Sequence, residues 1–274
     1  METRAFCNGK DGVKIRYEVR GQGTPLAMIM GYSASGRAWG EPLLQLLEKR
    51  FTTIVIDNRG TGESDKPDQP WTVVDMAADA VAVLDALKLA RAHIFGISMG
   101  GMIAQELALN FSTRVHGLIL GCTNSGMAHA VMGDPAAVAS LSPTSDLPLM
   151  EQARRALTAC CSTGFVASEQ GRRFIDERLA DLGKYPVTPL HTYARQWDAI
   201  TKFDTFDRLC AIKASTLVIT GSDDTIVPAK NSEILQERIA GAKLHEIKGA
   251  SHLFFWEAQA ETATAVAAFL AAIN

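Results

Sequence analysis

The sequence predicts an α/β fold: a doubly wound, mostly parallel sheet with one helical cap insertion. Short, continuously apolar runs recur along the chain, as is typical of parallel strands covered on both faces. Stretches with apolar residues three and four positions apart alternate with these runs, which indicates βαβ units. The alternation stops between about residues 124 and 207 and then resumes, which indicates an insertion within one sheet.

Each element of the expected sheet has its own segment. The segment Arg4–Val19 alternates around Gly9 to Gly12 and predicts a hairpin at the sheet edge. The parallel strands are expected at Leu26–Met30, Thr53–Ile56, His93–Phe95, Gly117–Leu120, Thr216–Ile219 and Leu244–Ile247. The covering helices are expected at Val74–Leu87, Met99–Asn110, Asn231–Ala240 and Ala258–Ile273.

The insertion is expected to span residues 124–207, between core parts 1–123 and 208–274. Its first part is rich in Met, Pro, Ser and Gly, and three helical patterns follow, at Leu149–Cys161, Ser168–Leu182 and Leu190–Ile200. A long insertion within a compact fold commonly carries function, and here we expect it to form a lid above the sheet.

Composition excludes several classes of protein. Hydrophobic residues make up 47% of the 274 residues and charged residues 21%, which is ordinary for a globular chain. With a formal charge of −3, the chain does not have the excess of basic residues that is typical of a nucleic-acid-binding protein. It also has no polybasic segment that would attract it to an acidic membrane surface. The amino-terminal residues contain no apolar signal region, and the five cysteines include no CxxC pair. These features predict a cytoplasmic protein with reduced thiols.

The motif Gly96-Ile97-Ser98-Met99-Gly100 follows an expected strand and begins an expected helix. A serine on such a tight turn needs neighbours without side chains two positions before and after it. The turn would expose the Ser98 hydroxyl and direct the Met99 N–H at a reacting carbonyl oxygen. A phosphate-binding glycine turn is the alternative, but no Walker lysine or ribose-binding acid follows.

A nucleophilic serine needs a base, and the base needs an orienting carboxylate. Of the six histidines, only His252 is expected in a loop at the carboxyl end of a sheet strand, where ligands bind in such sheets. Its alternative role is that of a hydrogen-bonded structural histidine. Asp223 and Asp224 follow another strand, and because adjacent side chains point in different directions, only one of them can face His252.

Four segments make the sequence resemble the α/β-hydrolase fold family, in its serine esterase and lactonase branch. They are the GISMGG segment around Ser98, IDNRGTGES (56–64), GSDDTIVP (221–228) and GASHLFFWE (249–257). In that family the acid commonly stands three residues after the glycine and four before the proline, which implies Asp224, with Asp223 as the second choice. Asp57 ends a strand in IDNRGTGES and could be mistaken for a catalytic acid, but we expect it to brace the loops near the Ser98 turn through Arg59 and backbone N–H groups.

The resemblance also implies an oxyanion hole. Many relatives have His-Gly-X after the first parallel strand, whereas this chain has Met30-Gly31-Tyr32, a variant similar to aclacinomycin methylesterase-like and enol-lactonase-like bacterial hydrolases. We therefore expect the backbone N–H groups of Tyr32 and Met99 to hold the oxyanion, with Gly31 allowing close approach. The substrate-binding residues are expected to be Gly31, Trp39, Met127, Trp197 and Leu253, although Met127 and Trp197 could instead be packing residues of the insertion.

Together these residues predict a serine hydrolase that needs no cofactor or metal. We expect it to cleave carboxylic esters of small molecules through an acyl-enzyme formed on Ser98, with His252 and Asp224 completing the triad. A lactonase acting on an acyl-homoserine lactone or an enol-lactone with the same triad is the main alternative. A cofactor-free haloperoxidase or perhydrolase and a non-enzymatic small-molecule receptor are further alternatives, and neither nucleic acid nor a membrane is expected as a partner.

Overall fold

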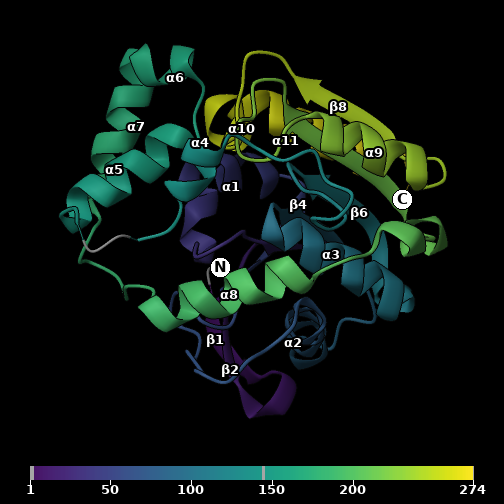
Figure 1. Ribbon diagram of the computed structural model, residues 1–274. Helices are drawn as coiled ribbons and strands as arrows, with labels where there is room; N and C mark the ends of the chain where they lie inside the picture. The colour runs from purple at the N-terminus through teal and green to yellow at the C-terminus, as the bar shows by residue number, and fades with distance from the viewer. Residues whose placement is uncertain (1–2, 144–145, 274) are drawn as a thin grey trace.

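The chain folds around an eight-stranded sheet with helices on both of its faces (Figure 1). The structure is a computed structural model that describes residues 3–143 and 146–273. The outer ends of the expected core, residues 1–2 and 274, and residues 144–145 of the expected insertion therefore lie outside the described residues.

The strands are connected as the sequence predicts. They are β1 (Thr3–Asn8), β2 (Lys14–Gly21), β3 (Thr24–Ile29), β4 (Phe51–Ile56), β5 (Ala92–Ile97), β6 (Val115–Gly121), β7 (Ser215–Gly221) and β8 (Lys243–Ile247). Their order in the sheet is β1-β2-β4-β3-β5-β6-β7-β8. The β1–β2 hairpin and the β2–β4 pair are antiparallel, and every other pair is parallel, so the expected mostly parallel sheet is confirmed.

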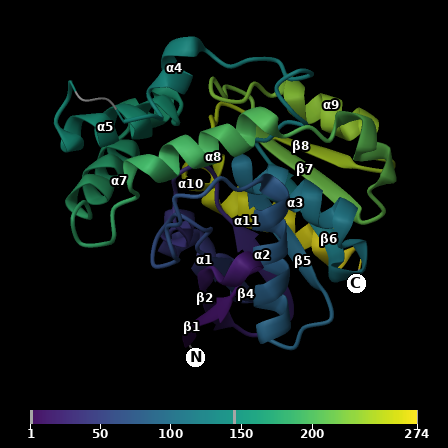
Figure 2. The ribbon, with the colours of Figure 1, turned by 60° about the horizontal axis from the view of Figure 1, so that its bottom comes forward.

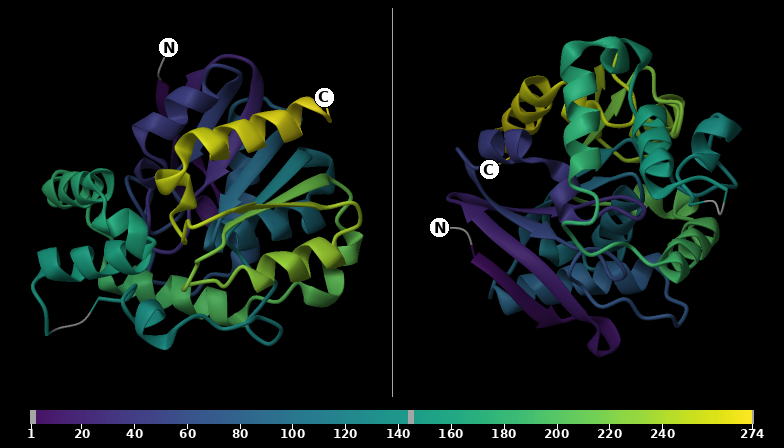
Figure 3. Two further views of the ribbon diagram at one scale, coloured as in Figure 1. Left: turned by 90° about the horizontal axis from the view of Figure 1, so that it is seen from above. Right: turned by 90° about the vertical axis from the view of Figure 1, so that its left-hand side faces the viewer.

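Helices cover the two faces of the sheet separately (Figure 3). The core helices are α1 (Glu41–Leu47), α2 (Val73–Ala86), α3 (Met99–Asn110), α9 (Lys230–Arg238), α10 (Phe254–Glu257) and α11 (Gln259–Ala271). Helices α2, α3 and α9 lie on one face, whereas α1 and α11 pack together on the other. Helix α1 was not expected; it is short and begins after Gly40, with a proline in its first turn.

Two hydrophobic cores result from this arrangement, one on each face. Ala27 and Ile29 of β3 belong to the core under α2 and α3, whereas Leu26 and Met28 belong to the core under α1 and α11. All four side chains are fully buried. Because successive residues of a strand point to opposite faces, a strand covered on both sides must be apolar throughout, which explains the continuous apolar run.

Within the described residues, five α-helices lie between β6 and β7. They are α4 (Pro135–Ala139), α5 (Leu149–Ala159), α6 (Thr163–Ala167), α7 (Glu169–Ala180) and α8 (Leu190–Lys202). Figure 2 shows α4, α5 and α7 to one side of the sheet, whereas α8 runs back across the core toward α9. Helices α5, α7 and α8 correspond to the three expected patterns. The five-residue helices α4 and α6 are too short to show a helical period, and Asp134 and Ser162 cap their first turns. We call residues 135–202 the α4–α8 segment.

No helix within residues 3–143 and 146–273 combines the length and the apolar character needed to cross a bilayer.

Candidate active site

Ser98 lies on the turn between β5 and α3, in a strained backbone conformation. Its φ of 56° and ψ of −120° are disfavoured for a residue with a side chain, and such strain costs about 1–3 kcal/mol. Two hydrogen bonds to the end of β6 hold the turn: the Ser98 N–H donates to the Gly121 carbonyl at 2.9 Å, and the Thr123 hydroxyl donates to the Ser98 carbonyl at 2.7 Å. The strain therefore occurs at the residue whose sequence motif predicts it.

The glycines of this motif are required by close backbone contacts. A Cβ atom on Gly96 would lie 2.1 Å from the Gly100 carbonyl oxygen, and one on Gly100 would lie 2.1 Å from the Ile29 carbonyl oxygen. A Cβ on Gly31 would lie 3.0 Å from the Ser98 Cβ and 3.5 Å from its Oγ. The loop after β3 thus passes directly beside the serine.

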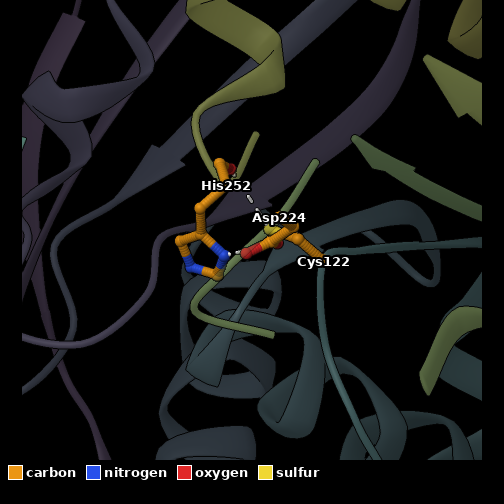
Figure 4. A group of neighbouring side chains, drawn as sticks. All are labelled: Cys122, Asp224 and His252. Atoms are coloured by element: carbon orange, nitrogen blue, oxygen red, sulfur yellow. Dashed lines mark hydrogen bonds and ion pairs between the residues drawn. The ribbon is translucent and has the colours of Figure 1, made fainter. Parts of the chain in front are cut away.

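His252 and Asp224 form a buried hydrogen-bonded pair (Figure 4). The His252 Nδ1 lies 2.8 Å from the Asp224 Oδ2, and the two residues are 6% and 5% exposed. The other carboxylate oxygen, Oδ1, accepts the backbone N–H groups of Ile226 and Val227 at 2.8 and 2.9 Å. Asp223 is exposed and instead accepts a hydrogen bond from the Ser222 hydroxyl, so of the two adjacent acids Asp224 is the one that faces His252.

The pair has the electrostatics that a proton acceptor requires. Burial acts to lower the pKa of His252, but the interactions with the Asp224 carboxylate and with Cys122 together outweigh burial, and the pKa lies well above its ordinary value of 6.5. The carboxylate thus stabilises the imidazolium that forms when His252 takes up a proton. With Nδ1 bonded to Asp224, Nε2 is the ring nitrogen left to accept that proton.

Cys122, at the end of β6, connects the serine turn to the histidine loop. Its neighbours Gly121 and Thr123 bond Ser98, and its own thiol donates to the His252 carbonyl at 3.5 Å (Figure 4). Burial raises the pKa of this thiol. Cys122 is therefore a neutral packing residue between the Ser98 turn and the His252 loop rather than a nucleophile.

One group of residues in the described part of the chain could hold a metal ion. The potential ligand atoms of Cys122, Asp224 and His252 lie within 4.8 Å of one another. The Asp224 carboxylate already accepts three hydrogen bonds, one of them from His252 Nδ1. Because a metal ion would have to displace these bonds, the group fits a hydrogen-bonded pair better than a metal centre.

The two expected oxyanion donors directly follow Ser98 and Gly31, the residues that meet where the loop after β3 passes the serine. Met99 is the first residue of α3, and its backbone N–H has no acceptor within the helix. Tyr32 follows Gly31 in a turn that the Ala34 N–H closes by donating to the Gly31 carbonyl at 3.3 Å. The Tyr32 hydroxyl reaches the Tyr193 carbonyl on α8 at 3.2 Å.

Three of the expected substrate-binding side chains are at least partly accessible, and two of them adjoin Tyr32 or His252. The Trp197 ring meets the Tyr32 ring edge-on at 5.9 Å, and 36% of Trp197 is exposed. Leu253 directly follows His252 and is half-buried, and its N–H donates to the Cys160 carbonyl at 2.9 Å. Met127 is half-buried in the loop that follows β6.

Trp39 is the exception, and the expectation that it binds substrate is wrong. Its ring is fully buried and packs on Phe95 at 4.7 Å and on Phe255 at 5.3 Å, in the core under α1 and α11. A single 3-10 turn over Gly36–Trp39 directs the ring into this core, a change of direction that no sequence period reveals.

Asp57 braces loops as expected, but not through Arg59. Its carboxylate accepts the Gly36 N–H at 2.7 Å and the Glu63 N–H at 3.0 Å. Arg59 instead forms a buried two-bond ion pair with Asp79 of α2, at 2.6 and 2.8 Å. The hydrogen bonds of the brace thus come from backbone N–H groups, and the arginine whose charge acts on Asp57 is Arg16 rather than Arg59.

The comparisons with known proteins agree with this geometry. Residues 24–259 match the profile of the alpha/beta hydrolase fold family. The chain belongs to the α/β-hydrolase fold family. The expected family and fold are thus confirmed, and the similarity to known hydrolases supports hydrolase activity for this chain.

Three relatives of this α/β hydrolase illustrate the range. A putative carbamate hydrolase, RutD, from Azorhizobium caulinodans is 29% identical over 91% of each chain. The 3-oxoadipate enol-lactonase 2 of Acinetobacter baylyi is 28% identical over 88% of this chain and 87% of its own. The solved structure of Est816, described as an N-acyl homoserine lactone degrading enzyme, is 29% identical, covers 97% of this chain and 100% of its own, and has a TM-score of 0.79.

Two positioning side chains of this α/β hydrolase were not expected. The Glu257 carboxylate accepts the N–H of Ser251, next to His252, at 3.1 Å and the Ser162 N–H at 3.0 Å. Gln196 of α8 accepts the Ser33 N–H at 2.7 Å. Glu257 ends one of the segments that carry the family resemblance, which is a usable signal, whereas nothing distinguishes Gln196 within its helix.

A cleft of about 660 Å³ lies beside the loop that follows β3. Residues from Ser33 to Glu41, β2, α5 and the chain around α7 line it. Ser98, Asp224 and His252 are not among its lining residues, so this cleft does not open onto these three side chains.

Proposed function

We propose that this α/β hydrolase cleaves carboxylic esters of small molecules through an acyl-enzyme on Ser98. The observation that carries the proposal is the buried 2.8 Å pair of His252 and Asp224, joined by the end of β6 to the strained Ser98 turn. A structural histidine pair would not require a serine held in a disfavoured backbone conformation beside it. The family membership supports the same reading.

The reaction follows from the hydrogen bonds. Ser98 Oγ attacks the ester carbonyl while His252 Nε2 takes its proton, and Asp224 stabilises the resulting imidazolium. The N–H groups of Tyr32 and Met99 receive the negative charge that develops on the carbonyl oxygen, and each such donor contributes about 3 kcal/mol to catalysis. His252 then protonates the departing alcohol, and a water molecule activated by the same nitrogen releases the acid.

A lactonase is the second candidate, favoured by the enol-lactonase and the homoserine-lactone-degrading relatives. A lactone is a cyclic ester, so the same three residues open it, and the alcohol remains attached to the acyl group. The carbamate hydrolase relative suggests a third carbonyl class for the same nucleophile. One relative, 26% identical, is named as a putative non-heme bromoperoxidase, so the perhydrolase alternative is tested as well.

A hydrolysis panel tests the proposal. The purified protein is assayed with p-nitrophenyl esters of increasing acyl length, acyl-homoserine lactones, an enol-lactone and an aryl carbamate, and peroxide is added in a separate series. We expect ester hydrolysis that falls by at least about 10³-fold in Ser98→Ala, because members of a triad act as a unit. The melting temperature of the variant serves as the folding control.

Three outcomes would redirect the assignment. Turnover of lactones far above that of open esters would select the lactonase. Tight binding of a small ligand without any turnover would favour a receptor. Residual hydrolysis by Ser98→Ala within tenfold of the wild type would refute Ser98 as the nucleophile.

A further inference from the structure

We infer that Gln196 is a positioning residue that couples α8 to the oxyanion hole. The inference rests on the proposed function, and in particular on the role of the Tyr32 N–H as an oxyanion donor. Gln196 has no contact with the reacting atoms; it acts through the backbone of the loop that carries Tyr32.

Both ends of the Gln196 amide are bound to the backbone of the core. Its Oε1 accepts the Ser33 N–H at 2.7 Å, and its Nε2 donates to the Arg59 carbonyl at 3.3 Å. The side chain is fully buried. A buried amide with oxygen and nitrogen both engaged is held in one orientation, because flipping it would place donor against donor and acceptor against acceptor.

The residue that Gln196 holds is itself strained. Ser33 has a φ of 57° and is the third residue of the Gly31–Ala34 turn, a position that favours glycine. A residue with a Cβ stays in this conformation only when its surroundings hold it there. Here the surroundings are the residues around α8: Gln196 binds the Ser33 N–H, and Thr188 donates to the Ser33 carbonyl at 3.0 Å.

The Ser33 N–H belongs to the peptide that joins Tyr32 to Ser33, one peptide away from the Tyr32 N–H. Holding this peptide in place restricts backbone rotation at Tyr32. The direction in which the Tyr32 N–H points is thereby fixed. If the hold is lost, the turn can relax toward a conformation with negative φ at Ser33 and carry the oxyanion donor away. Gln196 would therefore affect the transition state, in which the oxyanion exists, more than substrate binding.

Other contacts dock α8 independently of Gln196. Arg195 binds the Asp68 carbonyl at 2.5 Å, and His191 lies 3.0 Å from the Lys66 carbonyl. Thr192 packs so closely on Gly60 that a Cβ there would lie 2.5 Å from the threonine methyl. Replacing Gln196 should thus leave the helix in place, which makes its effect on the oxyanion loop separable from loss of docking.

The test compares Gln196→Met, which has similar length but no hydrogen bonds, with Arg195→Ala on the same helix. On a small p-nitrophenyl ester we expect Gln196→Met to lower kcat by roughly tenfold to a hundredfold, less than complete removal of an oxyanion donor, with KM changed less than about threefold. Its inhibition constant for an alkyl trifluoromethyl ketone, which forms an oxyanion adduct with the serine, should rise by a similar factor. Arg195→Ala should stay within about twofold of the wild type in kcat and inhibition constant.

Two further variants exclude a merely structural role. Gln196→Glu keeps the oxygen that accepts the Ser33 N–H, and because burial favours the neutral acid, its second oxygen can carry a proton and donate to the Arg59 carbonyl. This variant should therefore recover kcat relative to Gln196→Met. Thr188→Val, at a half-buried position, loosens the other side of Ser33 and should lower kcat in the same direction, which keeps the test available if Gln196→Met does not fold.

An unchanged kcat in folded Gln196→Met, or a lower kcat with an unchanged inhibition constant for the ketone, would overturn the inference while leaving the proposed function intact. Absence of hydrolysis by the wild type, or full activity of Ser98→Ala, would overturn the proposed function and the inference with it.

Discussion

Replacing Asp224 with asparagine should reverse the tautomer of His252 without disturbing the fold. The carboxylate has two distinct tasks: Oδ2 receives the His252 Nδ1–H, and Oδ1 receives the N–H groups of Ile226 and Val227. Asparagine has one oxygen and one NH₂ group, so its oxygen can accept either the His252 Nδ1–H or the two backbone N–H groups, but not both. The cost of leaving the backbone N–H groups unpaired determines which of these it accepts.

Two orientations of the asparagine amide compete. With its NH₂ toward the backbone, the N–H groups of Ile226 and Val227 are left unpaired in a buried position, at a cost of about 1–3 kcal/mol each. Even a total of about 2 kcal/mol favours the other orientation by about thirtyfold. The NH₂ then faces Nδ1, the imidazole proton moves to Nε2, and His252 cannot accept the proton of Ser98. A comparable replacement in a protease triad lowers kcat by about 10⁴-fold.

The assay is kcat/KM on a p-nitrophenyl ester for Asp224→Asn, with Asp223→Asn as the matched control. Asp223 is exposed and accepts a hydrogen bond from the Ser222 hydroxyl, so we expect its replacement to change kcat/KM by less than about threefold. A loss of less than tenfold in Asp224→Asn would refute the tautomer argument, as would a larger loss in Asp223→Asn.

Three more predictions follow from the site and its surroundings. Asp224 raises the pKa of His252, and the base must be neutral to act, so kcat/KM should fall as the pH drops through a midpoint above 6.5. Asp224→Asn should lower that midpoint. A wild-type midpoint below 6.5 would contradict the electrostatics. Trp197→Ala should shift preference toward bulkier acyl groups, with kcat on an acetate ester changed less than KM; an unchanged acyl-length profile would make Trp197 a packing residue only. Asp79→Ala should lower the free energy of unfolding by about 3–5 kcal/mol, measured in denaturant, because it leaves the buried Arg59 charge unpaired, and a loss below about 1 kcal/mol would show that water reaches that charge.

Local sequence pattern is sufficient for the sheet and for the position of the serine. Continuous apolar runs can be satisfied only in strands covered on both faces, and the six expected parallel strands are present. Close approach at Gly96 and Gly100 leaves no room for a side chain, so the motif specifies the tight turn at Ser98. The loops of Asp224 and His252 follow parallel strands, whose carboxyl ends meet along one edge of the sheet, so their proximity is also implied by the sequence.

Contacts between distant segments could not be predicted in the same way, because no local repeat of apolar residues specifies them. Which of Asp223 and Asp224 turns inward depends on the backbone of a single loop, and Trp39 enters the core because a short turn rotates its ring toward Phe95. Gln196 reaches Ser33 across 163 residues of chain. Along its helix that glutamine is one polar residue among several, and its role arises only when α8 docks on the loop after β3, because hydrogen bonds of this kind depend on how two finished elements pack rather than on how either one forms.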